Sequence, residues 1–263
     1  MRIRWGNAHY VWDAFNPDSY FAHNYESLRD DDRALLEGVR DFFAGVADTR
    51  EIAPGSLRGL DIGPGANLYP SLAMLPFCRS LTLREFSAAN VRWLDAEISG
   101  SYGPSWDAFW DVLQGRPQWK AIEDPRAVLK ARSHVGQGSI FDLRDAARGG
   151  EAFEIGTMFF VAESLTRRRS EFDDAVRRFV DALVPDAPFA CAFMKQSRGY
   201  RVDDRAFPAV AIGADDVTEC LASVAYDVDV RVIELSESGD PLRDGYEGMI
   251  LATGYRRREP ERM

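Results

Sequence analysis

Short apolar runs alternate with amphipathic segments along most of this chain, which predicts alternating strands and helices. Apolar residues three to four apart over residues 30–46 predict a long helix ahead of the first strand. We expect strands at 57–62, 80–86, 133–141, 154–161, 189–194, 228–235 and 246–253, and further helices at 69–78, 88–98, 172–183 and 215–225. Because the last two strands follow each other closely, we expect an α/β fold whose mostly parallel, seven-stranded sheet has an antiparallel pair at one edge.

The length of 263 residues suits a single large domain, 1–263. We expect residues 1–53 to form an N-terminal lid and helix, and residues 54–263 to form the core, with an aromatic-rich insertion at about 99–132. Residues 5–25 are rich in Trp, Tyr, Phe and Asn and follow no regular period. They predict either a cap anchored by its aromatic side chains or a lid over a bound ligand.

A glycine-rich turn after the first strand is the feature around which the rest of the chain is arranged. Gly63 and Gly65 carry no side chain, so the backbone there can turn tightly and approach a ligand. Glu85 ends the next strand, where a carboxylate can accept hydrogen bonds from both hydroxyls of a ribose. The turn and the acid together predict a nucleoside site at the carboxyl edge of the sheet.

The residues around the turn favour S-adenosylmethionine over a dinucleotide. A dinucleotide fingerprint has a third glycine where this chain has Leu68. Asp61, just before the turn, repels a pyrophosphate but suits the ammonium and sulfonium groups of S-adenosylmethionine. A nicotinamide-dependent oxidoreductase is therefore the weaker alternative.

Charge and cysteine usage exclude several classes of protein. Lys+Arg 32 minus Asp+Glu 42 gives a net charge of −10, which disfavours a nucleic-acid partner. The three cysteines have no disulfide framework, and neither a membrane-spanning run nor a signal peptide's apolar centre is found, so we expect a cytoplasmic protein with no membrane partner. No cluster has the spacing of metal ligands, which disfavours a metal-dependent O-methyltransferase.

Four stretches of the chain resemble the family of small-molecule methyltransferases that includes nicotinamide, phenylethanolamine and indolethylamine (thioether) methyltransferases. Residues 15–25, Phe-Asn-Pro-Asp-Ser-Tyr-Phe-Ala-His-Asn-Tyr, resemble its Phe-x-Pro-x-x-Tyr lid, and residues 61–69 resemble its glycine loop. Glu85 with Asn90 resembles its acid-x-x-x-x-Asn element, and residues 244–252 resemble its C-terminal strand. The likeness spans nearly the whole chain, and the chain resembles a divergent, bacterial-type member of the family. It implies a Rossmann-like class I methyltransferase fold with S-adenosylmethionine as the cofactor.

The resemblance also implies which residues hold the cofactor. Where the family often has an aspartate and an apolar residue at the adenine, this chain has a serine and an isoleucine, with an aspartate slightly later. The expected contacts are Tyr20, Tyr25 and Tyr69 on the carboxylate, Asp61, Gly63 and Gly65 at the methionine portion, Glu85 on the ribose, Asn90 close by, and Ser139, Ile140 and Asp142 at the adenine. The alternative is that Tyr20 and Tyr25 are buried aromatic residues with satisfied hydroxyls and Asn90 is a helix-surface amide.

The chain departs from the family where the methyl acceptor is expected. Amine-methylating members often end the fifth strand with an acid, whereas this chain has Met194, so the acceptors of the named relatives do not transfer to it. Candidates for substrate contact are His23, Glu163, Ser164, Met194 and Tyr200, and none of them is assigned as a catalytic base. For His23, the sequence favours an ordinary solvent-exposed histidine over a substrate contact.

The sequence thus predicts a methyltransferase that acts on N, O or S of a small, aromatic or amphipathic metabolite, as a monomer or weak dimer. The aromatic residues of 102–119 would line or close the acceptor pocket. The alternative is a catalytically inactive protein that keeps the fold and binds S-adenosylmethionine, S-adenosylhomocysteine or a protein partner. The missing acid at Met194 and the polar third strand motivate that alternative.

Overall fold

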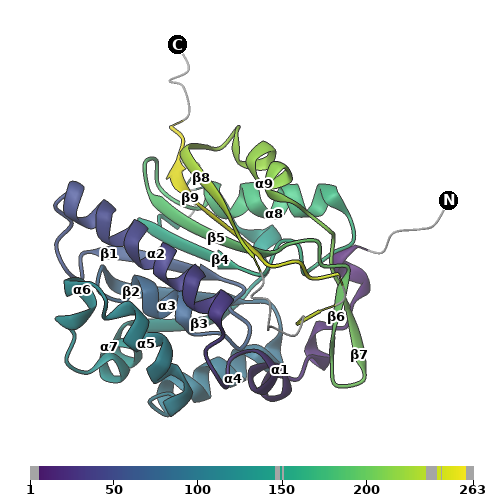
Figure 1. Ribbon diagram of the computed structural model, residues 1–263, viewed down its shortest axis with the longest axis horizontal. Coiled ribbons are helices and arrows are strands. Elements are labelled where there is room, and N and C mark those ends of the chain that lie inside the picture. Colours follow the sequence, from purple (N-terminus) through teal and green to yellow (C-terminus); the bar gives the residue numbers. More distant parts are fainter. Residues whose placement is uncertain (1–5, 146–148, 150, 235–241, 244, 259–263) are drawn as a thin grey trace.

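A seven-stranded sheet forms the centre of the fold, in the order β3-β2-β1-β4-β5-β9-β8 (Figure 1). The computed structural model describes residues 6–145, 149, 151–234, 242–243 and 245–258. The strands of the sheet are β1 Leu57–Ile62, β2 Cys78–Glu85, β3 Ser133–Gln137, β4 Ile155–Phe159, β5 Pro188–Met194, β8 Ala225–Ile233 and β9 Met249–Arg256. Strands β1 to β5 run parallel to one another, and β9 runs antiparallel to both β5 and β8. The predicted α/β fold is confirmed.

The antiparallel pair lies at one edge of the sheet, with the reversed strand β9 on the inside and β8 outermost. β9 begins at Met249 rather than at the expected residue 246, because Gly245 and Gly248 hold the left-handed backbone (φ +74° and +108°) that interrupts a strand. Leu235, the expected end of the previous strand, and Asp244, the first residue of the C-terminal motif, lie outside the described residues.

Helices pack on both faces of the sheet, and each face has its own apolar core. On β5, Phe189 and Phe193 face the core formed with α8 and α9, whereas Ala190 and Met194 face the core formed with α2 and α3. Burial on both faces explains why the central strands are continuous apolar runs. The helices are α1 Pro17–Asn24, α2 Asp30–Thr49, α3 Tyr69–Met74, α4 Ala88–Ser99, α5 Asp107–Leu113, α6 Pro117–Lys120, α7 Pro125–Arg132, α8 Arg169–Asp181 and α9 Ala214–Leu221.

The aromatic-rich insertion folds into the short helices α5, α6 and α7 beside the sheet (Figure 1). Trp106, Phe109 and Trp119 are fully buried in it, and the indole N–H of Trp119 donates to the carbonyl of Leu72, 3.1 Å away. Residues 102–119 therefore complete the apolar core. They line neither of the two cavities described below, so the expectation that they form the acceptor pocket is wrong.

The N-terminal segment, residues 6–25, packs against a hairpin that the sequence analysis missed. The hairpin consists of β6 Gly199–Val202 and β7 Arg205–Pro208, and Figure 1 shows it beside this segment. Trp12 stacks on Phe207 with ring centroids 5.6 Å apart, and the amide of Asn16 donates to Asp203 over 2.8 Å. Asn16 also caps α1, because its side-chain oxygen accepts two main-chain N–H groups of the first turn.

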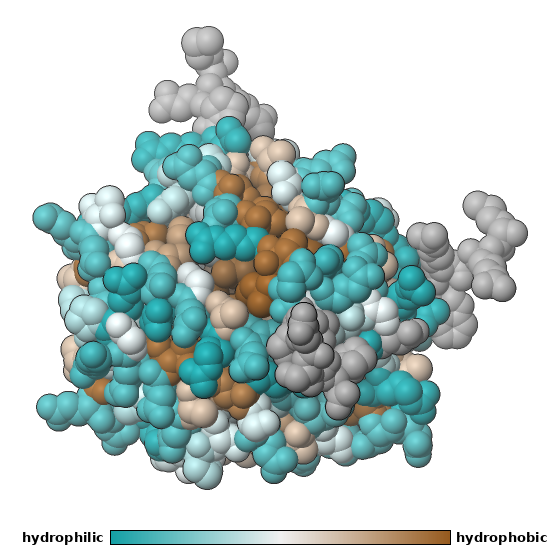
Figure 2. Space-filling model, in the orientation of Figure 1, coloured by the Kyte–Doolittle hydropathy of each residue, from teal (hydrophilic) through white to brown (hydrophobic). Residues whose placement is uncertain are grey.

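Hydrophilic side chains cover most of the face seen in Figure 2, and apolar side chains show through near its middle. Such a surface agrees with the high content of charged residues, 28% of the chain. Among the helices of the described residues, none combines the length and apolar character that a membrane span needs.

Candidate active site

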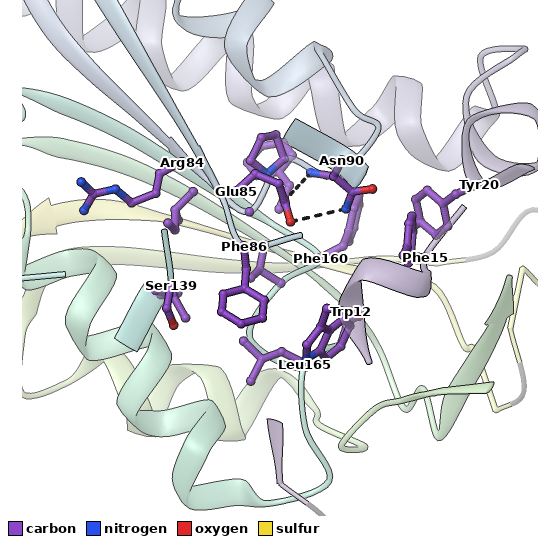
Figure 3. Close-up of a pocket in the computed structure, with 18 of the residues that line it drawn as sticks. Trp12, Phe15, Tyr20, Arg84, Glu85, Phe86, Asn90, Ser139, Phe160 and Leu165 are labelled. Carbon is purple, nitrogen blue, oxygen red and sulfur yellow. Dashed lines mark hydrogen bonds between the residues drawn. The ribbon is translucent and has the colours of Figure 1, made fainter. Parts of the chain in front are cut away.

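A cavity enclosing about 790 Å³ of empty space, part of it open to solvent, lies at the carboxyl ends of the parallel strands (Figure 3). Ligands of doubly wound sheets bind at this edge. We call it the strand-edge cavity. Its lining residues are Asn7, Trp12, Phe15, Tyr20, Tyr25, Ile62, Gly63, Pro64, Gly65, Arg84, Glu85, Phe86, Asn90, Gly138, Ser139, Ile140, Phe159, Phe160, Val161, Ser164, Leu165 and Tyr200.

The glycine turn after β1 forms part of the cavity wall. Gly63 and Gly65 both adopt positive φ, +66° and +62°, which only glycine accepts readily. A Cβ on Gly63 would lie 2.8 Å from Val161, so the turn also packs too closely for any side chain there. The N–H groups of Gly63 and Gly65 donate to the carbonyl of Arg84 and to Glu85, so the turn is held in place and no side chain stands between its backbone and the cavity.

Glu85 is the polar centre of the cavity. The N–H of Gly65 donates to its Oε2 over 3.0 Å and the N–H of Ser87 donates to its Oε1 over 2.8 Å. Burial raises the pKa of Glu85, although the hydrogen bonds from these N–H groups and from Asn90 counteract that effect. Each carboxylate oxygen can accept two hydrogen bonds, so Glu85 retains acceptor capacity for a ligand.

Asn90 lies next to Glu85 and is itself 6% exposed. Its amide Nδ2 donates to Glu85 Oε1 over 3.4 Å, which fixes the orientation of the amide. Figure 3 shows the amide oxygen directed away from Glu85. Within the described part of the chain, that buried oxygen has no hydrogen-bond partner. A buried acceptor of this kind is costly unless a ligand donates to it.

Apolar side chains form the wall beside Glu85. Figure 3 shows Trp12, Phe86 and Leu165 on one side of the cavity. Phe86 is 47% exposed, which is unusual for a large apolar residue and leaves its ring accessible to a flat ligand. Ser139 and Ile140 line the same cavity, and the Ser139 hydroxyl accepts the N–H of Phe141, 3.1 Å away.

The three predicted tyrosines do not occupy equivalent places. Tyr20 and Tyr25 line the cavity, with ring centroids 5.9 Å apart. Tyr69 lies behind Tyr25, fully buried, and its hydroxyl donates to Asp32 over 3.0 Å. Burial raises the pKa of Asp32 to about 8, so this carboxyl group holds its proton at neutral pH.

Asp61 and Asp142 also do not line the strand-edge cavity. The Asp61 carboxylate is fully buried and accepts hydrogen bonds from Ser71, at 2.7 Å, and Thr157, at 3.0 Å. Asp61 thereby ties β1 to α3 and β4 beneath the glycine turn. Burial raises its pKa to about 7.

The candidates for substrate contact divide into two groups. Ser164 and Tyr200 line the strand-edge cavity, and His23 lies exposed in a neighbouring cavity. Glu163 and Met194 are buried and line neither cavity; Glu163 Oε1 accepts the N–H of Met194 over 3.0 Å. Thus β5 ends in Met194 rather than an acid, and an acid from another segment, Glu163, is buried against the main chain of Met194.

Phe160, which follows β4 in the cavity wall, holds a left-handed backbone with φ +61°. This conformation costs about 1–2 kcal/mol for a residue with a side chain. Strain of this kind collects at functional sites.

Sequence reasoning missed Arg243. Its guanidinium is 7% exposed and donates to the Ser164 hydroxyl and to the Tyr20 hydroxyl, each over 2.7 Å. It also lies over the ring of Tyr200, 4.4 Å from the centroid. Nothing in the local sequence separates this arginine from a surface one, because all its partners come from distant segments.

Among the described residues, no group of three or more His, Cys, Asp or Glu side chains could hold a metal ion. Cys78, Cys191 and Cys220 are free and buried, which agrees with the absence of a disulfide framework in the sequence.

Two solved structures with TM-scores above 0.5 agree with the fold, and a third is similar to this chain at a lower TM-score. An S-adenosylmethionine-dependent methyltransferase from Clostridium acetobutylicum ATCC 824 is 11% identical, with a TM-score of 0.55 over 92% of this chain and 100% of that one. A SAM-dependent methyltransferase from Methanosarcina mazei is 11% identical, with a TM-score of 0.51 over 81% and 98%. The N-methyltransferase NodS from Bradyrhizobium japonicum WM9, in complex with S-adenosylhomocysteine, is 15% identical, with a TM-score of 0.46 over 92% and 99%.

Among curated proteins, none matches the chain in sequence. The model of the NNMT/PNMT/TEMT family matches residues 6–254, which includes the N-terminal segment, the glycine turn and most of β9. The resemblance found in the sequence is thus confirmed: the chain belongs to the NNMT/PNMT/TEMT family and is an S-adenosylmethionine-dependent methyltransferase.

Proposed function

We propose that this methyltransferase modifies nitrogen, oxygen or sulfur of a small, aromatic or amphipathic molecule. The observation that carries the proposal is the aromatic cover over the strand-edge cavity. Trp12, Phe15 and Tyr20 close one side of it, and the β6–β7 hairpin packs behind them through Phe207. An acceptor beneath such a cover must be small, and a net charge of −10 further disfavours a nucleic acid.

The lining of the cavity fits S-adenosylmethionine. Glu85 offers two carboxylate oxygens to a ribose diol, and Gly63 leaves the backbone bare where the methionine portion would approach. The buried Asn90 oxygen, without a partner among the described residues, offers an acceptor to a hydroxyl or an ammonium group. Glu85 and the Asn90 oxygen thus suit hydrogen-bond donors on the ligand, which the ribose and ammonium groups of the cofactor supply.

The remaining lining residues suit the two ends of the cofactor. Phe86 and Ile140 present apolar surface to a purine, and Tyr20 and Tyr25 lie where the amino-acid end would be covered. Three predicted contacts are absent from this proposed set because they do not line the cavity: Asp61, Tyr69 and Asp142.

When bound, S-adenosylmethionine supplies a methyl group on an electrophilic sulfonium, so the protein mainly has to align the acceptor and exclude water. Among the described residues that line the cavity, Glu85 is the only carboxylate and none is a histidine. Burial raises the pKa of the Tyr25 and Tyr200 hydroxyls well above 10, so both stay protonated and donate hydrogen bonds rather than accept a proton. The acceptor therefore brings a nucleophile that needs no base, or one that loses its proton to water after transfer.

Transfer from methyl-labelled S-adenosylmethionine tests this proposal. The purified protein would be incubated with pools of small amines, pyridines, phenols, thiols and acids, and separately with total RNA and a protein lysate. We expect label in a small-molecule product. Label in RNA or protein alone would contradict the proposal, and cofactor binding with no transfer to any pool would favour the catalytically inactive alternative.

A further inference from the structure

A second cavity adjoins the strand-edge cavity and shares Tyr20 and Tyr200 with it. It lies between α1 and the β6–β7 hairpin and has about 1290 Å³ of empty space, part of it open to solvent. We call it the arginine pocket, because its lining includes Arg167, Arg198, Arg201 and Arg243. The two shared tyrosines thus lie at the boundary between the two cavities.

The charge of the arginine pocket is opposite to that of the protein. Four arginines line it in a chain whose net charge is −10. Asp203 is the one carboxylate among its described lining residues, and the amide of Asn16 already donates to it. The side chains of Arg167 and Arg198 make no hydrogen bond or ion pair with any described residue, and Arg201 donates to a main-chain carbonyl. The pocket therefore concentrates positive charge, and among the described residues no carboxylate forms an ion pair with any of its four arginines.

Arg243 brings this charge to the inner end of the pocket. Its guanidinium has five N–H donors, and two of them are used, on Ser164 and Tyr20. Burying a charged group is costly unless an opposite charge pairs with it. The field of the buried Glu163 acts on Arg243, yet among the described residues no carboxylate lies within 4.0 Å of its nitrogens. Arg243 thus holds an incompletely paired cation beside the strand-edge cavity.

We propose that the methyl acceptor is a small organic acid whose anionic group binds in the arginine pocket. Its carboxylate, phosphate or sulfate pairs with Arg243 and the exposed Arg167 and Arg198, while its nucleophile passes Tyr20 and Tyr200 towards the cofactor. This inference rests on the proposed function and adds that the methyl acceptor is an anion.

Binding of matched probes to the protein saturated with S-adenosylhomocysteine tests the proposal. The probes are benzoate, phenyl phosphate and phenyl sulfate, compared with neutral benzyl alcohol and cationic benzylamine, each followed by isothermal titration calorimetry. We expect at least one anion to bind about tenfold or more tightly than the neutral and cationic probes. Equal or tighter binding of benzyl alcohol or benzylamine, or no binding of any anion, would overturn the proposal.

Two variants locate the anion. Arg243→Met removes the buried charge, and the double variant Arg167→Gln/Arg198→Gln removes two exposed charges with little risk to folding. The control is Arg33→Gln/Arg177→Gln, which changes the net charge equally at two exposed arginines that line neither cavity. We expect the affinity for the anion to fall about tenfold or more in the pocket variants and to stay unchanged in the control. An equal fall in the control, or none in the double variant, would contradict the proposal.

The carboxylate of the cofactor is the other possible partner of Arg243, and a second comparison separates the two. S-adenosylhomocysteine carries that carboxylate and 5′-methylthioadenosine lacks it. We expect Arg243→Met to leave the affinity ratio of these two ligands unchanged. A loss confined to S-adenosylhomocysteine would assign Arg243 to the cofactor and overturn the proposal. Failure of the parent protein to bind either ligand would instead contradict the proposed function.

Discussion

Replacement of Glu85 by glutamine changes the proposed ribose site with little change of shape. Glu85 is 6% exposed and accepts the main-chain N–H groups of Gly65 and Ser87 as well as the amide of Asn90. Glutamine has one acceptor oxygen and one NH₂ group. It therefore cannot accept both main-chain N–H groups, and one of them would face a second donor.

The expected loss falls mainly on cofactor binding. A hydrogen bond to a charged group contributes about 1.5–3 kcal/mol, and a ribose diol makes two of them. Glutamine keeps at most one, uncharged, so we expect a loss of about 2–4 kcal/mol, or about a 30- to 1000-fold higher Kd. The free energy of unfolding should change by less than the free energy of binding. Glutamine leaves one main-chain N–H unpaired, which destabilises the fold, but it also removes a buried charge whose cost is seen in the raised pKa of Glu85.

Calorimetric titration with S-adenosylhomocysteine and urea unfolding measure these two quantities. The matched control is Glu154→Gln, since Glu154 also accepts a main-chain N–H of β1, that of Arg58 over 2.8 Å, at the opposite end of the strand. We expect the control to bind like the parent protein. A folded Glu85→Gln variant that binds within about threefold of the parent would refute the assignment of Glu85 to the ribose.

Three further predictions follow from the site. Gly63→Ala should lower the thermal midpoint, because its Cβ would lie 2.8 Å from Val161 at positive φ, whereas Gly65→Ala should lose mainly affinity for S-adenosylhomocysteine. Trp12→Ala should speed hydrogen exchange in the β6–β7 hairpin and weaken cofactor binding. Burial raises the pKa of Asp32 from 3.8 to about 8, so the folded protein retains a proton that the unfolded chain releases. The free energy of unfolding should therefore fall as the pH rises from about 4 to 8, and Asp32→Asn should reduce that fall in urea titrations.

Each of these predictions has a result that would contradict it. Equal thermal midpoints for the parent and Gly63→Ala would show that the turn can move away from Val161. Unchanged exchange in the hairpin of Trp12→Ala would mean that the stacking on Phe207 does not order it. An identical pH dependence for the parent and Asp32→Asn would show that this carboxyl group is ionised in the folded protein.

The sheet and the glycine turn were predictable because their signals are local. The central strands are buried on both faces, so each reads as a continuous apolar run in the sequence. The turn, with Gly63 and Gly65, and the acid Glu85 follow consecutive strands, and parallel strands bring their carboxyl ends to one edge. Sequence spacing alone was enough to bring these residues together.

The hairpin and Arg243 could not be predicted because their stability comes from distant contacts. Residues 199–208 contain only three buried residues, Val202, Phe207 and Pro208, which are too few to make a period. Their partners, Trp12 and Phe15, lie almost two hundred residues earlier in the chain. The surroundings of Arg243 likewise exist only after folding.

The side chains of Asp61 and Tyr69 show why a position next to the glycine turn in the sequence does not determine whether a residue lines the cavity. Both flank the glycine turn, yet each side chain points away from the cavity, Asp61 towards Ser71 and Thr157 and Tyr69 towards Asp32. The direction of a side chain at the end of a strand or the start of a helix depends on the packing around it. The sequence identifies the turn but not which of its neighbours face the ligand.

The most direct test of the account is equilibrium titration of the purified protein with S-adenosylhomocysteine and, separately, with NAD. We predict micromolar binding of S-adenosylhomocysteine and none of NAD, because Leu68 stands where a dinucleotide fingerprint has its third glycine and the cavity presents Glu85 and the buried Asn90 oxygen to a ribose and an ammonium group. Binding of NAD in preference, or no binding of S-adenosylhomocysteine to the folded protein, would contradict the account.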